Sequence, residues 1–217
     1  MAELTLTIGN KNYSSWSLRP WLAAKVGGIA FDEVLIPLYV PGSKDEILTH
    51  SGAGKVPVLH HGDVTVWESL AICEYLAETF PEAELWPSDP AARAAARAVA
   101  TEMHGGFVPL RRHLPMNCRR TPSIREIPAE VRADIDRVCT VWRDCRARFG
   151  VSGQFLFGSF SIADAMYAPV VSRFQSYRVP LDATETAYCT AVMALSPMQE
   201  WIAAARTEPW MVENFEV

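Results

Sequence analysis

The sequence lacks several features that would place it in other classes of protein. It has no apolar run near the roughly 20 residues that a membrane-spanning helix needs, and its first residues have neither the basic nor the apolar region of a signal peptide. A formal net charge of -5 provides no general attraction to nucleic acid or to anionic lipid. We therefore expect a cytoplasmic protein that binds neither nucleic acid nor a membrane.

Cysteine is also poorly arranged for disulfide or metal chemistry. The five cysteines are an odd number, and none of them forms a CxxC pair or a zinc-like cluster. Structural disulfides are rare in a reducing compartment, so we expect small buried hydrophobic side chains and no metal cofactor. These residues are Cys73, Cys118, Cys139, Cys145 and Cys189.

The first 80 residues consist of short segments of mixed type. The alternating run 4–8 is typical of a strand, and Gly27 and Gly28 end a helix that begins near Leu18. By similar patterns we expect strands at 31–36, 56–59 and 64–66 and helices at 18–26 and 68–78. The order β-α-β followed by β-β-α predicts an α/β domain with a mixed four-stranded sheet.

The sequence pattern changes from short mixed segments to long helical ones after residues 81–90, a segment that contains three prolines. From residue 91 on, we expect five helical segments. They are 91–114, which Pro109 kinks or interrupts, 127–149, 161–176 with a kink at Pro169, 183–195 and 197–204. The sequence therefore predicts an α/β domain over 1–80, a linker over 81–90 and an all-helical domain over 91–217.

Three serines, Ser14, Ser15 and Ser17, stand where the first helix must begin. Capping of that helix explains them equally well, because a serine oxygen accepts an orphan N–H of the first turn. A helix N-terminus also stabilises anions, and a serine hydroxyl can donate to a thiolate docked there. No cysteine lies in this turn, so the reactive sulfur would arrive on a ligand.

A second candidate site is Lys55-Val56-Pro57. Proline at the start of a strand is explained by an edge position or by a cis peptide bond. In the cis form, the backbone of Val56 would face a peptide-like ligand, and Lys55 could meet a carboxylate.

A third candidate site is Glu68-Ser69, where another helix opens. Exposed backbone N–H groups and the Ser69 hydroxyl could hold an anion, and Glu68 could pair with an ammonium group. Capping is again the alternative. Together the three sites suit a short, charged peptide that carries a thiol.

With these motifs in this order, the chain resembles the cytosolic glutathione transferase superfamily along essentially its whole length. Ser161 and Asp164 stand at the S-x-x-D spacing of a capping box, which resembles a buried motif of the family's helical domain. The resemblance implies a thioredoxin-like N-terminal domain, an all-α C-terminal domain, glutathione as co-substrate and a homodimer.

The resemblance also implies roles for individual residues. Ser14 is the first choice for the hydroxyl that binds the glutathione thiolate, Ser15 is the second, and Tyr13 is a weaker candidate. Lys55 and Val56 match the residues that hold the glycyl and cysteinyl parts. Glu68 and Ser69 match those that hold the γ-glutamyl end, and Pro57 matches the cis-proline.

The stretch Ser14-Ser15-Trp16-Ser17 is most similar to the zeta class, although Trp16 stands where that class has cysteine. The resemblance implies conjugation of glutathione to a small electrophile. A glutathione-dependent isomerase of the maleylacetoacetate type, a peroxidase and an interaction module without turnover remain alternatives.

The electrophile is expected between the domains, against the first long helix of the second one. Candidates are Met103, Phe107 and Arg111, with His104 and His113 beside them. Met103 and Phe107 are four residues apart and could equally belong to the core.

Overall fold

A mixed sheet of four strands forms the first part of the molecule. The computed structural model describes residues 3–216. The sheet order is β2-β1-β3-β4, with β1 parallel to β2 and antiparallel to β3. This confirms the sheet that the sequence predicts. The strands are β1 (Leu4–Ile8), β2 (Asp32–Leu35), β3 (Val58–His61) and β4 (Val64–Trp67).

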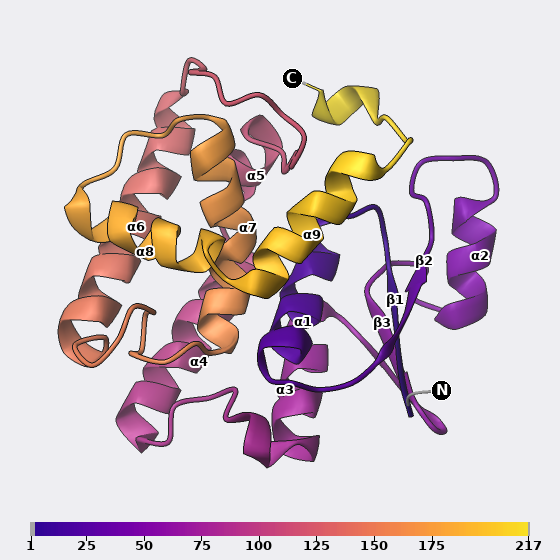
Figure 1. Cartoon of the computed structure of the whole chain (residues 1–217). Helices are drawn as coiled ribbons and strands as arrows, with labels where there is room; N and C mark the ends of the chain where they lie inside the picture. Colours follow the sequence, from indigo (N-terminus) through magenta and orange to yellow (C-terminus); the bar gives the residue numbers. More distant parts are fainter. Residues whose placement is uncertain (1–2, 217) are drawn as a thin grey trace.

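Three helices accompany the sheet, and α1 and α3 pack against each other (Figure 1). They are α1 (Ser15–Val26), α2 (Ser43–His50) and α3 (Ser69–Thr79). Helix α2 is absent from the sequence prediction. It buries only Ser43 and Ile47, so the apolar periodicity that would reveal a helix is missing.

The rest of the chain is helical, apart from loops and a short 3-10 turn near each end of this part. The first 3-10 turn spans Pro81–Ala83 in the predicted linker. The helices are α4 (Pro90–Gly105), α5 (Val108–His113), α6 (Ala129–Phe149), α7 (Ile162–Ser176), α8 (Ala183–Met193) and α9 (Ser196–Thr207), followed by the 3-10 turn Glu213–Phe215.

The helical segment expected at 91–114 is interrupted rather than kinked, and the chain breaks between α4 and α5, just before Pro109. Gly106 is extended, and a Cβ there would lie 2.7 Å from the Glu102 carbonyl oxygen. Phe107 then takes a left-handed conformation with φ 59°. Pro109 falls in the first turn of α5, where its missing N–H costs nothing, so it helps to start a helix rather than kink one.

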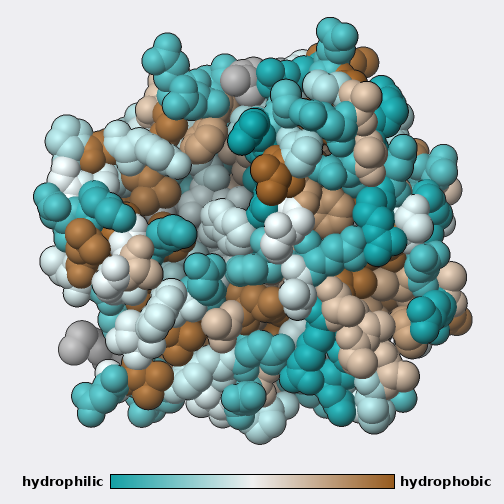
Figure 2. Space-filling model, turned by 180° about the vertical axis from the view of Figure 1, so that it is seen from behind, coloured by the Kyte–Doolittle hydropathy of each residue, from teal (hydrophilic) through white to brown (hydrophobic). Residues whose placement is uncertain are grey.

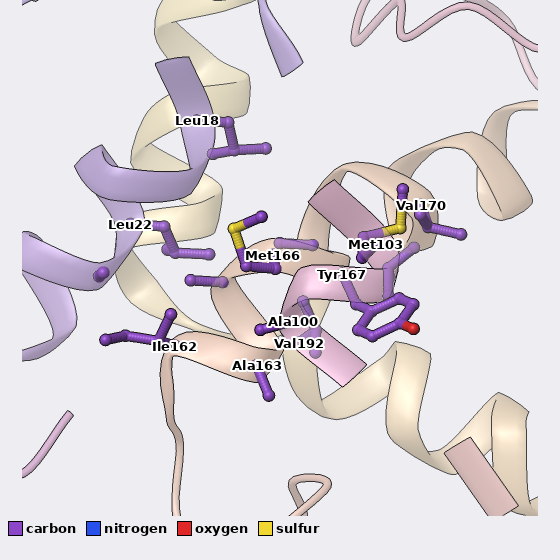
Figure 3. Packing of buried hydrophobic residues seen from close by; sticks show 14 of the residues in the cluster. Leu18, Leu22, Ala100, Met103, Ile162, Ala163, Met166, Tyr167, Val170 and Val192 are labelled. Carbon is purple, nitrogen blue, oxygen red and sulfur yellow. The ribbon is translucent and has the colours of Figure 1, made fainter. Parts of the chain in front are cut away.

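The core joins both parts of the chain through α7. Almost every residue of α7 is buried, and α7 packs against α1 and α4. Figure 3 shows Leu18 and Leu22 of α1 facing Met166 of α7, with Met103 of α4 near Tyr167. Helix α7 is enclosed on all sides and therefore buries polar residues such as Asp164 and Arg173 as well as apolar ones.

The five cysteines are free thiols, as expected. Cys73, Cys139 and Cys145 are buried, and Cys118 and Cys189 are half-buried. Burial raises the pKa of each thiol, to about 11 or 12, so these thiols stay protonated and unreactive at neutral pH.

The predicted capping box forms at the start of α7. The Asp164 carboxylate accepts hydrogen bonds from the backbone N–H of Ser161 at 2.8 Å, the Ser161 hydroxyl at 3.0 Å and the backbone N–H of Leu156 at 3.0 Å. Asp164 therefore ties the loop before α7 to the helix.

We predict that Asp164→Ala destabilises the protein by about 3 kcal/mol, because it leaves three buried donors without their acceptor. Asp182→Ala is the matched control. Asp182 also precedes a helix, but it is exposed and caps nothing, so its loss is expected to cost about 0.5 kcal/mol or less. Urea unfolding measures both, and equal losses would contradict the structural role of Asp164.

Candidate active site

The chain between β1 and α1 is held by contacts from both parts of the molecule. The Glu208 carboxylate accepts from the backbone N–H groups of Lys11 at 2.6 Å and Asn12 at 3.0 Å. The Ser17 hydroxyl oxygen accepts from the backbone N–H of Gly9 at 3.1 Å. These bonds fix the turn at the start of α1.

Ser14 and Ser15 are both nearly buried at this helix start, and each has a different partner. Ser14 is the N-cap of α1: its hydroxyl lies 3.4 Å from the backbone nitrogen of Ser17 and 2.7 Å from the Ser17 hydroxyl. The Ser15 hydroxyl accepts from a guanidinium nitrogen of Arg173 at 3.3 Å. The capping interpretation thus holds for Ser14, and both serines also face a pocket.

Tyr13 also borders the pocket, but its hydroxyl is engaged by other groups. It donates to Glu216 and accepts from Arg119 at 2.8 Å and from the backbone N–H of Val212 at 3.2 Å. A hydroxyl with these three partners ties the C-terminal segment to the turn.

The pocket has a volume of about 750 Å³ and brings the predicted residues together. Figure 2 shows the molecule from behind, with a hollow near the middle of that face and hydrophobic residues scattered among hydrophilic ones. The predicted residues in the pocket lining are Tyr13, Ser14, Ser15, Lys55, Val56, Pro57, Glu68, Ser69 and Arg111.

The Val56–Pro57 peptide bond is cis, the sharper of the two alternatives that the sequence left open. The loop before it is supported by Lys44 of α2, whose ammonium group donates to the Gly54 carbonyl at 2.8 Å. The Lys55 side chain is exposed at the edge of the pocket. Ligand backbone and carboxylate groups can therefore reach this wall.

Glu68 and Ser69 line the pocket at the start of α3, next to this loop, because Val58 of β3 pairs with Trp67 of β4. Glu68 has φ 69°, a left-handed value that is rare for a side chain other than glycine. Its carboxylate lies 3.5 Å from the His104 ring. The buried Ser69 hydroxyl has no hydrogen-bond partner within residues 3–216, so it is available to a ligand.

The charged residues that line the pocket are mostly cations. They are Lys44, Lys55, Arg111 and Arg173, against the single carboxylate of Glu68. The protein is acidic as a whole, so this local excess of positive charge is specific to the pocket. It favours an anionic ligand.

Two predicted substrate residues do not line the pocket. Met103 is fully buried in the core against α7, as Figure 3 shows, and Phe107 is 8% exposed and also packs into the core. His113 is outside the lining and lies 3.1 Å from Glu130. Of Met103, Phe107 and Arg111, only Arg111 lines the pocket.

Several lining residues were missed by the sequence analysis. Trp16 is one of them, and its ring centroid lies 4.2 Å from the central guanidinium carbon of Arg19 and 5.1 Å from that of Arg111. Others come from segments far away in the sequence. Arg173 comes from α7 and Phe215 from the C-terminal 3-10 turn. Among these residues, only Trp16 had a signal in the sequence, which is its place beside Ser15 in the serine turn.

Within the described residues, no group of His, Cys, Asp and Glu could hold a metal ion. Over the same part of the chain, no helix is long and apolar enough to cross a membrane.

Comparison with known proteins identifies the family. The sequence profile of the glutathione S-transferase N-terminal domain matches residues 13–79, and that of the C-terminal domain matches residues 90–204. The chain therefore belongs to the glutathione S-transferase family, which confirms the resemblance drawn from its motifs.

Two curated relatives and one solved structure illustrate this relationship. The chain is 36% identical to a probable maleylacetoacetate isomerase of Caenorhabditis elegans over 96 residues, 44% of each protein. It is 29% identical to maleylacetoacetate isomerase of Rattus norvegicus over 171 residues, 77% of this chain and 76% of the relative. The match thus spans less than half of the first relative and about three quarters of the second.

The solved structure is a glutathione transferase homologue from Burkholderia with bound glutathione. It is 22% identical, has a TM-score of 0.72 and covers 96% of this chain and all of that one. Its similarity establishes the shared fold of a thioredoxin-like and an all-helical part.

Because Met103 is a core residue, we predict that Met103→Ala destabilises the protein by about 2–5 kcal/mol and leaves the Kd for glutathione unchanged. Arg111→Met is the matched variant at a half-buried lining position, with an expected stability change within about 1 kcal/mol. Urea unfolding and titration calorimetry measure the two quantities. If Met103→Ala instead raised the Kd for glutathione while its stability stayed at the wild-type level, Met103 would be a pocket residue.

Proposed function

We propose that the protein is a glutathione transferase that binds glutathione as a thiolate at the start of α1 and conjugates it to a small electrophile. The observation that carries the proposal is the pair Ser14 and Ser15, which open a helix inside a pocket rich in cations. The helix N-terminus and a hydroxyl donor both favour the sulfur anion over the thiol.

The pocket walls support a pose for the whole tripeptide. Lys55 and the Val56 backbone hold the glycyl and cysteinyl parts beside the cis bond to Pro57. Glu68 pairs with the ammonium group of the γ-glutamyl end, and the unpartnered Ser69 hydroxyl binds its carboxylate. Tyr13 contributes to the wall of the pocket, since its hydroxyl already has partners.

The reaction follows from this placement. The thiol loses its proton to solvent, and the thiolate forms a C–S bond to the electrophilic carbon beside Arg111 and Trp16. With an aryl halide, the carbon–halogen bond breaks and halide leaves to solvent. Rate arises from the larger thiolate fraction and from holding both reactants together. We further propose a cytoplasmic homodimer divided into domains at 1–80 and 91–217 with a linker at 81–90.

An isomerase acting on a cis-dienoic acid is the second candidate, because both curated relatives are isomerases of maleylacetoacetate by name. A peroxidase would use the same thiolate. Trp16 stands where the zeta class has cysteine, and this difference favours conjugation over isomerisation.

We predict that the double variant Ser14→Ala/Ser15→Ala loses about 100-fold in kcat with an aryl halide, while its Kd for glutathione rises far less, because the lost bond serves the thiolate. Ser159→Ala is the control, since Ser159 is exposed and distant from the pocket. An unchanged kcat in the double variant would remove both serines from the mechanism.

The stoichiometry of glutathione separates the candidate reactions. Conjugation consumes one glutathione per product, a peroxidase oxidises two to the disulfide for each hydroperoxide, and an isomerase consumes none. An aryl halide, an organic hydroperoxide and a cis-dienoic acid are assayed side by side. We expect net consumption of glutathione without formation of glutathione disulfide. Binding of glutathione without turnover of any of them would instead indicate an interaction module.

A further inference from the structure

Three arginines from three helices lie in or behind the wall of the pocket, and Arg111 and Arg173 line it. Arg19 comes from α1, Arg111 from α5 and Arg173 from α7. Arg19 is fully buried and Arg173 is 4% exposed. None of the three forms an ion pair with a carboxylate of residues 3–216, and all three guanidinium nitrogens of Arg19 lack a hydrogen-bond partner there.

These arginines keep their charge despite burial and mutual repulsion. Burial and the neighbouring Arg173 and Arg111 lower the pKa of Arg19 to about 9, and burial and Arg111 lower that of Arg173 to about 10. Both remain cations at neutral pH. Trp16 compensates part of the cost through cation–π contacts with Arg19 and Arg111. An anion in the pocket would compensate more.

Arg173 is held in one orientation by three bonds. One of its N–H groups donates to the Leu114 carbonyl at 2.8 Å and another to the Pro169 carbonyl at 3.2 Å. The third bond is the one to the Ser15 hydroxyl at 3.3 Å. Because a guanidinium can only donate, the Ser15 oxygen must accept, and the hydroxyl proton remains free.

The Ser15 proton has no acceptor among the described residues, whereas Ser14 has one. The Ser14 and Ser17 hydroxyls are 2.7 Å apart, so Ser14 can donate to Ser17 while its oxygen caps the helix. Ser15 lines the pocket and is 6% exposed. Its proton can therefore be directed into the pocket.

We propose that Ser15, rather than Ser14, donates the hydrogen bond to the glutathione thiolate, and that Arg173 is the positioning residue that makes Ser15 a donor. Glutathione releases its thiol proton to solvent, the sulfur keeps the electron pair, and no covalent bond to the protein forms. Arg19 supports this arrangement as a buried cation beside Arg173. The inference rests on the proposed function, because it concerns the same bound thiolate.

The experiment is a double-variant cycle read out as the pKa of bound glutathione. Thiolate ultraviolet absorbance is followed across pH in wild type, Ser15→Ala, Arg173→Met and the double variant, with Ser14→Ala alongside. Arg173→Lys keeps the charge without the planar group that reaches both carbonyls and Ser15. Arg148→Met removes an exposed arginine far from the pocket and is the charge control.

We expect Ser15→Ala and Arg173→Met each to raise the pKa of the bound thiol by about 1 unit, a roughly tenfold fall in its ionisation constant. In the Ser15→Ala background, Arg173→Met should add almost nothing, because Arg173 acts through Ser15. Arg173→Lys should resemble Arg173→Met, and Arg148→Met should resemble wild type.

Three results would overturn the proposal. They are a shift in Ser14→Ala with none in Ser15→Ala, fully additive shifts in the double variant, or an Arg173→Met effect confined to the KM of acidic electrophiles. The last would make Arg173 a substrate contact. If Arg173→Met does not fold, the Ser14→Ala and Ser15→Ala pair still decides between the serines.

Failure of the inference is distinguishable from failure of the proposed function. If the pKa of bound glutathione is below that of free glutathione in wild type and stays low in Ser15→Ala, the proposed transferase function still holds but Ser15 is not the donor. A wild-type pKa equal to that of free glutathione removes thiolate stabilisation altogether.

Discussion

The contact between α1 and α7 is the interaction on which both the fold and the pocket depend. Each helix is buried along most of its length. Helix α1 lies beside the sheet, and α7 lies within the helical part (Figure 1). Their packing joins the two parts of the chain into one core. The same contact brings Ser15 at the start of α1 beside Arg173 near the end of α7.

This arrangement explains why polar residues occur in an otherwise apolar interface. Burying a guanidinium without an acidic partner is expensive, and cores seldom tolerate it unless another interaction compensates. Here Arg173 bonds two backbone carbonyls, while Arg19 relies on the face of Trp16. The buried arginines thus lower the folding stability of the region beside the pocket. Their positive potential in turn favours an anionic ligand there.

Much of the fold was predictable because it follows from local signals. Alternation and turn residues revealed the four strands, and the serine turn, the Val56–Pro57 pair and Glu68-Ser69 all line one pocket. Helix α2 was not predicted, since its exposed, polar sequence has almost no buried face. Met103 was misplaced although Ala92, Ala96 and Ala100 share its buried face at helical spacing. Arg173 and Phe215 could not be placed, because their distance in sequence hides their proximity in space.

The C-terminal 3-10 turn has a practical consequence for handling the protein. Phe215 borders the pocket, and Glu216 bonds Tyr13 and Asn117. A fusion partner or affinity tag attached directly after this segment would be anchored at the mouth of the pocket. Strand β1, in contrast, begins at the end of the sheet opposite the serine turn (Figure 1). Immobilisation through the N-terminal side therefore leaves the pocket accessible.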